Sequence, residues 1–168
     1  ISNYSMDFDG SSDFIDCGDF SGLISNKITI SAWIKRNSSI GNYAIVAGIR
    51  NTSNGPSPYI INLQTASSKI IKFIITQSDS TSVVVSSNTL IENNTWYHVA
   101  GVADGSNVKL YVNGDLQTDQ KTYDGTIISP TQNFNIGRQP SNANYYWDGQ
   151  IDQVTVFDYG LSQDQVTQ

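Results

Sequence analysis

The stretch Trp147-Asp-Gly-Gln-Ile-Asp-Gln-Val-Thr-Val-Phe157 predicts a β-strand, and the rest of the chain is interpreted around it. Ile151, Val154 and Val156 supply the β-branched apolar side chains of a buried strand, and Asp148-Gly149 turns the chain into it. Asp158-Tyr-Gly160 then ends the run. Ser162, with Gln165 three residues later, marks the start of one short helix. We expect this strand and helix to close the domain.

Further strands are predicted upstream by apolar residues that alternate with polar ones, separated by Gly, Asn, Asp and Ser. About a dozen short strands with hardly any helical periodicity predict an all-β sandwich or barrel. The predicted strands before residue 147 cover residues 4–8, 14–17, 28–34, 43–50, 59–63, 70–76, 83–87, 96–103, 108–112, 116–122 and 134–137.

Some of these strands carry a more specific prediction. Residues 28–34 are expected to bury Ile and Ala on one face and to expose Trp33 on the other. Residues 44–49 are apolar almost throughout, which indicates burial on both faces and a central place in a sheet. Asp104-Gly105 predicts a hairpin between residues 96–103 and 108–112. The single Cys17 cannot form an internal disulfide and is expected to be a small buried hydrophobe.

Length and charge limit the classes of protein to which this chain can belong. The 168 residues suffice for a single domain, predicted to span 1–168 as one module of a longer polypeptide. Nine Lys and Arg against 15 Asp and Glu give a formal charge of −6, which makes binding to nucleic acid or to an anionic membrane improbable. No apolar run reaches the roughly 20 residues of a membrane-spanning helix, so no membrane insertion is expected. Neutral ligands, or cations, suit such a chain better.

The closing segment resembles that of laminin-G-like and pentraxin-like domains in the concanavalin A-like lectin/glucanase superfamily, where an aromatic-x-Gly-x-Ile-Asp-x-Val stretch leads to a small helix. Three upstream matches lie in the same order: Met6-Asp-Phe-Asp-Gly10, Ile28-Thr-Ile-Ser-Ala-Trp-Ile34, and Trp96-Tyr-His-Val-Ala-Gly-Val102 with Val108-Lys-Leu-Tyr-Val-Asn-Gly114. The resemblance implies a two-sheet antiparallel jelly-roll sandwich with one short C-terminal helix. It also implies a non-catalytic binding module outside the cell, on a cell surface or on a virion such as a viral fibre.

A first candidate site is a calcium site formed by Asp9, Asp13 and Asp152. The first and last strands of a sandwich commonly pair, which would bring Asp9 close to Asp152. Calcium binds six to eight oxygen ligands, and carbonyls of Gly10-Ser11-Ser12 could complete the set. Family members often hold a structural calcium near their termini, as the resemblance implies for these three residues. The alternative is that Asp9 caps its own turn without a metal.

A second candidate site is a carbohydrate site in the loops 51–58 and 138–147. Sugars are bound by aromatic faces that stack on C–H patches and by amide and guanidinium groups that bond hydroxyls. Each member could equally be structural or simply solvated. The residues of this type are Tyr43, Arg50, Asn51, Tyr59, Arg138, Asn142, Asn144, Tyr145 and Trp147.

Catalysis is not expected. His98 is the sole histidine, lies within a predicted strand, and is interpreted as structural. A glycosidase needs two carboxylates at a suitable separation. In the glucanases that the resemblance brings in, these acids are placed as Glu-x-Asp-x-x-Glu or similar on a concave strand, yet Glu92 is the only glutamate here. Three hypotheses remain in order: a calcium-stabilised module for adhesion to a glycan or glycoprotein, a structural or assembly domain that contacts other domains of a large surface or virion protein, and a glycoside hydrolase.

Overall fold

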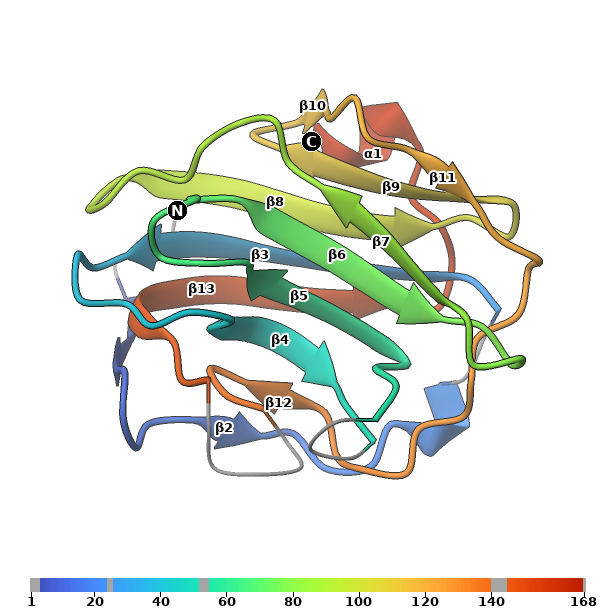
Figure 1. Cartoon of the computed structure of the whole chain (residues 1–168), viewed down its shortest axis with the longest axis horizontal. Helices are drawn as coiled ribbons and strands as arrows, with labels where there is room; N and C mark the ends of the chain where they lie inside the picture. Colours follow the sequence, from blue (N-terminus) through green and yellow to red (C-terminus); the bar gives the residue numbers. More distant parts are fainter. Residues whose placement is uncertain (1–3, 24–25, 52–54, 140–144, 168) are drawn as a thin grey trace.

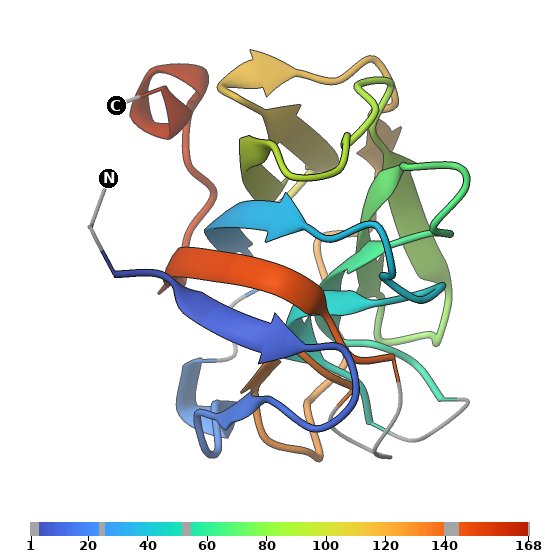
Figure 2. The ribbon, with the colours of Figure 1, turned by 90° about the vertical axis from the view of Figure 1, so that its left-hand side faces the viewer.

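The protein is a sandwich of two antiparallel sheets, seen face-on in Figure 1 and edge-on in Figure 2. The computed structural model describes residues 4–23, 26–51, 55–139 and 145–167. A seven-stranded sheet, called sheet A, runs in the order β1 (Met6–Asp9), β13 (Asp148–Phe157), β3 (Ile28–Arg36), β8 (Trp96–Ala103), β9 (Asn107–Val112) and β10 (Asp115–Leu116), with β11 (Lys121–Thr122) also paired to β9.

The second sheet, called sheet B, has six strands. Its order is β2 (Ile15–Asp16), β12 (Asn135–Ile136), β4 (Ile45–Ile49), β5 (Tyr59–Leu63), β6 (Ile71–Thr76) and β7 (Ser82–Ser86). The β8–β9 hairpin confirms the predicted connection, and β4 is buried along its whole length in a central position.

The core lies between the sheets and follows the predicted alternation. In β3 the side chains of Ile28, Ile30, Ala32 and Ile34 are buried, while Trp33 lies on the opposite, outer face of sheet A. Large side chains from both sheets complete the core, among them Phe73, Phe134 and Trp147. The sandwich therefore leaves two outer faces, one on each sheet.

Two local predictions are wrong. Cys17 is exposed, because β2 ends at Asp16 and the alternation that would bury the next side chain stops there. Residues 116–122 do not form one strand. Two short strands, β10 and β11, pair separately with β9.

The stretch 147–157 takes the predicted place. β13 lies between β1 and β3 and pairs antiparallel with both. Asp148 and Gly149 were predicted to turn the chain, but they are the first two residues of β13. Gly149 has a φ of 132°, and a Cβ there would lie 2.1 Å from the backbone oxygen of Lys35, so this strand position requires glycine.

The short helix α1 (Gln163–Val166) folds back onto the outer face of sheet A (Figure 2). Ser162 is its N-cap, and Gln165 completes the predicted capping box. Val166 and Leu161 pack on a small apolar cluster formed by Ala100, Val102 and Tyr111. The outer face of sheet A is therefore partly covered, and α1 forms a wall along it.

Candidate functional site

Tyr43 and Tyr145 form an exposed aromatic pair beside the start of β4. Their ring centroids are 5.8 Å apart with the planes near perpendicular, and the side chains are 49% and 38% exposed. The two residues come from segments about a hundred positions apart in the sequence. Both residues were predicted to belong to one ligand site, and the fold brings their rings into contact.

The backbone holds this pair in place at a conformational cost. Tyr43 and Tyr145 have φ values of 59° and 58°, in the left-handed region that bulky residues rarely adopt. The amide of Tyr43 donates to the carbonyl of Gln64 at 3.2 Å, and the carbonyl of Tyr145 accepts from the amide of Ile45 at 2.9 Å. The backbone of each tyrosine is thus anchored beside sheet B, next to the end of β5 and at the start of β4.

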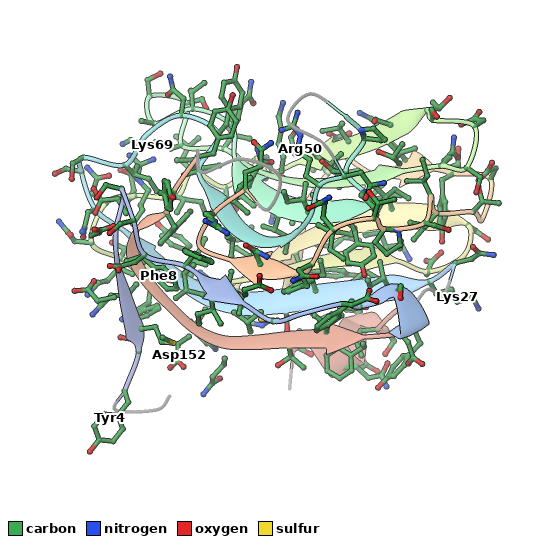
Figure 3. The ribbon with its side chains drawn as sticks, turned by 90° about the horizontal axis from the view of Figure 1, so that it is seen from below. Tyr4, Phe8, Lys27, Arg50, Lys69 and Asp152 are labelled. Carbon is green, nitrogen blue, oxygen red and sulfur yellow. The ribbon has the colours of Figure 1, made fainter. Side chains whose placement is uncertain are left out.

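Arg50 lies at the other end of β4, on the sheet B side of the sandwich (Figure 3). It lines a hollow of about 490 Å³ together with Gly55, Pro56 and Ser57 from the following loop. The floor comes from β6 and β7 through Ile74, Ser82 and Val84, with Ser80 from the turn between them. The guanidinium Nε of Arg50 is buried without a hydrogen-bond partner in the described part of the chain.

Three of the predicted ligand residues lie in the interior instead. Asn51 is buried and joins two loops, since its amide donates to Ser129 at 3.0 Å and accepts from Thr131 at 2.8 Å. Tyr59 is buried against Phe134, and this burial, with the nearby charge of Asp19, raises its pKa to about 12. Trp147 is fully buried. None of the three presents its side chain to a ligand in this structure.

Arg138 occupies a third position, near the edge of sheet B. Its guanidinium carbon lies 3.2 Å from the centroid of the Phe14 ring, and its Nε donates to Asn135 at 3.2 Å. The side chain is thus fastened to β12 and to the segment before β2. Asn142 and Asn144, also predicted to bind ligand, lie outside the described residues.

The predicted calcium ligands do not form one cluster. β1 pairs with β13 as expected, but Asp9 faces Asp148, and Asp152 lies four residues further along β13, roughly 13 Å away at strand spacing. Asp152 instead faces Trp33 across to β3, on the sheet A side of the sandwich (Figure 3). In the described residues no group of three or more His, Cys, Asp or Glu side chains could hold a metal ion.

Asp9 caps its own turn, as the metal-free alternative had it. Its carboxylate accepts from the amides of Ser12 at 2.7 Å, Ser11 at 2.8 Å and Asp13 at 3.1 Å, and from both serine hydroxyls. Bonds from Ser12, and then from Ser11 and Asp13, hold the pKa of Asp9 far below its usual value. The carboxylate of Asp13 in turn accepts from the amide of Asp9 at 3.1 Å.

A groove on the outer face of sheet A was missed by the sequence analysis. Trp33 and His98 form its floor as neighbours on β3 and β8, with ring centroids 5.5 Å apart, and its volume is about 400 Å³. Burial lowers the pKa of His98 below its usual value. Trp33 was predicted to face outward, but nothing in the sequence indicated that α1 would wall it in.

Among the described residues, no carboxylate lines the Arg50 hollow or the groove on sheet A. Glu92, the only glutamate, forms an ion pair with Lys69 at 2.5 Å. Asp104 is likewise paired with Lys109 at 2.7 Å, and hydrogen bonds from Lys109 and from the turn outweigh its burial to keep its pKa low. The geometry of the hollow and of the groove favours binding.

Comparison with known proteins identifies the fold. The sequence model described as the concanavalin A-like lectin/glucanases superfamily matches residues 9–167. No curated protein sequence matches. Within the described residues there is no helix long and apolar enough to cross a membrane.

Solved structures with the same fold are distant in sequence. A heptameric SAP-like pentraxin from Limulus polyphemus is 20% identical, with a TM-score of 0.69 over 97% of this chain and 79% of its own. Domain 4 of AbnA, an extracellular arabinanase of Geobacillus stearothermophilus, was solved with arabinotriose. It is 20% identical, with a TM-score of 0.73 over 97% of this chain and 74% of that one.

A third similar structure is the CBM40 of a Ruminococcus gnavus sialidase, solved with α2,3-sialyllactose. It is 15% identical, with a TM-score of 0.71 over 98% of this chain and 96% of its own. At these identities the three structures establish the architecture alone.

Proposed function

The chain belongs to the concanavalin A-like lectin/glucanase superfamily, and from this premise we propose that it is a non-catalytic carbohydrate-binding module. Two of the similar structures hold oligosaccharides, arabinotriose and sialyllactose. The proposal includes a location outside the cell or on a cell or virion surface, where polysaccharides and glycoproteins are met. It names a glycan or glycoprotein as partner and leaves the sugar open.

The observation that carries the proposal is the Tyr43–Tyr145 pair. Two large aromatic rings are held in solvent by left-handed backbone, a conformation that costs roughly 1 kcal/mol or more per residue and that clusters at functional sites. Despite this cost the two side chains are not withdrawn into the core, since they stay 49% and 38% exposed. A preset aromatic surface is what a sugar ring needs for stacking.

The test replaces each tyrosine with asparagine, which tolerates left-handed backbone better than tyrosine does. Tyr43→Asn and Tyr145→Asn are expected to keep the melting temperature within a few degrees and to weaken glycan binding at least about tenfold, as loss of one stacking contact implies. A glycan array identifies the ligand, and calorimetry with that ligand measures the change.

Tyr4→Ala is the matched control, because Tyr4 is the most exposed large hydrophobic side chain at 87% and lies near β1. Its removal should leave the affinity unchanged. Unaltered affinity in both asparagine variants would overturn the assignment of the pair. Absence of binding to any glycan would instead favour the alternative, an assembly domain. For that role exposed Met6, in the edge strand β1, and exposed Tyr4 just before it offer a contact surface.

Structural calcium is kept as a separate proposal. What supports it is the pairing of Asp9 with Asp148, which places two carboxylates opposite each other on β1 and β13. Competing donors oppose it: Asp148 already accepts from the Asn37 amide at 2.7 Å and the Ser39 hydroxyl at 2.5 Å, and Asp9 accepts from its turn. An ion would have to replace some of these bonds.

A further inference from the structure

The groove on the outer face of sheet A has an aromatic floor. Trp33 and His98 lie side by side on β3 and β8, and Ser31 and Ala100 are the next outward-facing pair along the same two strands. Trp33 and His98 are both half-buried, so their rings offer a surface that is partly dry and still open. Apolar side chains of Phe157, Leu161 and Val166 extend this surface.

The wall made by α1 is fastened to the sheet at several points. The Thr29 hydroxyl donates to the carbonyl of Tyr159 at 2.8 Å and accepts from the amide of Leu161 at 3.0 Å. The side-chain amide of Gln163 donates to the carbonyl of Gly114 at 2.6 Å. The groove is therefore part of the fixed fold, and its shape does not depend on a ligand.

Two residues at the rim adopt unusual backbone. Gln153 has a φ of 49° and lies within the irregularity between Asp152 and Thr155, where one extra residue in β13 opposes β3. Such bulges redirect a side chain, and they are frequent beside binding sites. Asn113, with a φ of 53°, turns the chain at the opposite rim. Both residues line the groove.

Polar groups of the groove remain open to a ligand. In the described part of the chain, no hydrogen bond engages a ring nitrogen of Trp33 or His98. None of these three nitrogens is among the fully buried atoms that lack a partner. Asn113 uses its side-chain oxygen to accept from the amide of His98 at 2.9 Å, which leaves its NH₂ group to donate. Gln165 likewise uses its oxygen in the capping box.

The charge of the groove selects the class of ligand. Among its described lining residues, His98 is the single group that can become charged, and burial lowers its pKa, which favours the neutral imidazole. The groove thus provides no counter-ion for an acidic or basic ligand. It combines a stacking surface with hydroxyl and amide groups, the mixture that recognises a neutral sugar.

We propose that this groove is a second binding site and that it takes the end of a neutral saccharide, with one sugar ring stacked on Trp33. It lies on the outer face of sheet A, whereas Tyr43 and Tyr145 are bonded to sheet B, so the two sites are separate. The proposal stands on the groove alone and does not require the tyrosine pair to bind.

The test uses His98 as a reporter, because it is the only histidine in the chain. Its imidazole resonance and the indole resonance of Trp33 are followed by NMR while neutral oligosaccharides are added: arabino-, xylo-, gluco-, manno- and galacto-oligosaccharides, with sialyllactose as the acidic comparison. At least one neutral sugar is expected to shift both resonances to saturation by roughly millimolar concentration. Sialyllactose should shift them less.

Variants assign the shifts to the groove. Trp33→Ala is expected to weaken the response at least about tenfold, and Ser31→Leu, which fills the floor without removing an aromatic ring, should block it. Trp96→Ala is the matched control, since Trp96 contacts Lys35 and does not line the groove. It should leave the response unchanged.

The outcomes separate this proposal from the function proposed above. The response at His98 should persist in the Tyr43→Asn/Tyr145→Asn double variant. A flat titration with every neutral sugar would overturn the second site. So would a response that survives both Trp33→Ala and Ser31→Leu, or a stronger response to sialyllactose or to an apolar peptide than to any neutral sugar.

Discussion

His98, a lone histidine within a predicted strand, was interpreted from the sequence as a structural residue, whereas in the structure it lines the groove on sheet A. Its alternation was correct, because neighbouring Val99 is buried and His98 faces outward. What the alternation could not show is that Trp33 would lie beside it and that α1 would cover that side of the sheet. These contacts join segments of the chain that are far apart.

His98 predicts a dependence of stability on pH. Because burial lowers its pKa in the folded state, the unfolded chain binds the proton first as pH falls below about 6.5. This contribution to the free energy of unfolding is therefore complete above that pH and is lost as pH falls toward the folded-state pKa. Denaturant unfolding between pH 7 and 5 should show the loss.

The His98→Gln variant serves as the reference for that measurement. With no other histidine in the chain, its stability should be nearly constant over the same range, where carboxylates are already ionised. Equal slopes for both proteins would show that His98 titrates alike in the folded and unfolded states.

Some of the predicted ligand residues are exposed and others are buried, and contacts between distant parts of the chain decide which. Tyr43 and Tyr145 could be chosen as aromatic loop residues, and the structure exposes both. Trp147 and Tyr59 have the same chemistry and are buried, because Trp147 immediately precedes a core strand and Tyr59 begins one. Composition selects side chains that can bind sugar, but burial depends on which strand each loop joins.

Strands were the most predictable elements, because alternation is a local property. β3, β4, β8 and β13 were found within a few residues of their ends, and Ser162 with Gln165 located α1. The bulge at Gln153 and the division of residues 116–122 into β10 and β11 were not predictable. Both depend on registers set by partner strands, which a single segment does not encode.

Gly149 tests whether the entry into β13 decides the fold. Gly149→Ala would place a methyl group 2.1 Å from the Lys35 oxygen at a φ of 132°, so the free energy of unfolding should fall by more than about 2 kcal/mol. Denaturant unfolding measures the loss. Gly41→Ala is the control, because a Cβ there meets no atom within 4 Å. A loss of stability as small as that of the control would show that the start of β13 can move away from β3 to make room for the methyl group.

A calcium ion between Asp9 and Asp148 would affect the stability of the whole molecule, because it would join the first strand to the last. Under that proposal chelator lowers the melting temperature, calcium restores it and magnesium does not. The response should shrink in Asp148→Asn. Identical melting curves with chelator and with calcium would dispose of the ion and leave the Asp9 turn held by its own hydrogen bonds.

The position of β13 between β1 and β3 also has a consequence for biosynthesis. The pairings of β13 join residues 148–157 to residues 6–9 and 29–36, so a nascent chain cannot complete sheet A until residue 157 has left the ribosome. Until then β1 has no neighbour and the outer edge of β3 stays open to other chains. Contacts this distant in sequence also slow closure, and we expect that the finished sandwich forms in a single late step, after β13 has emerged.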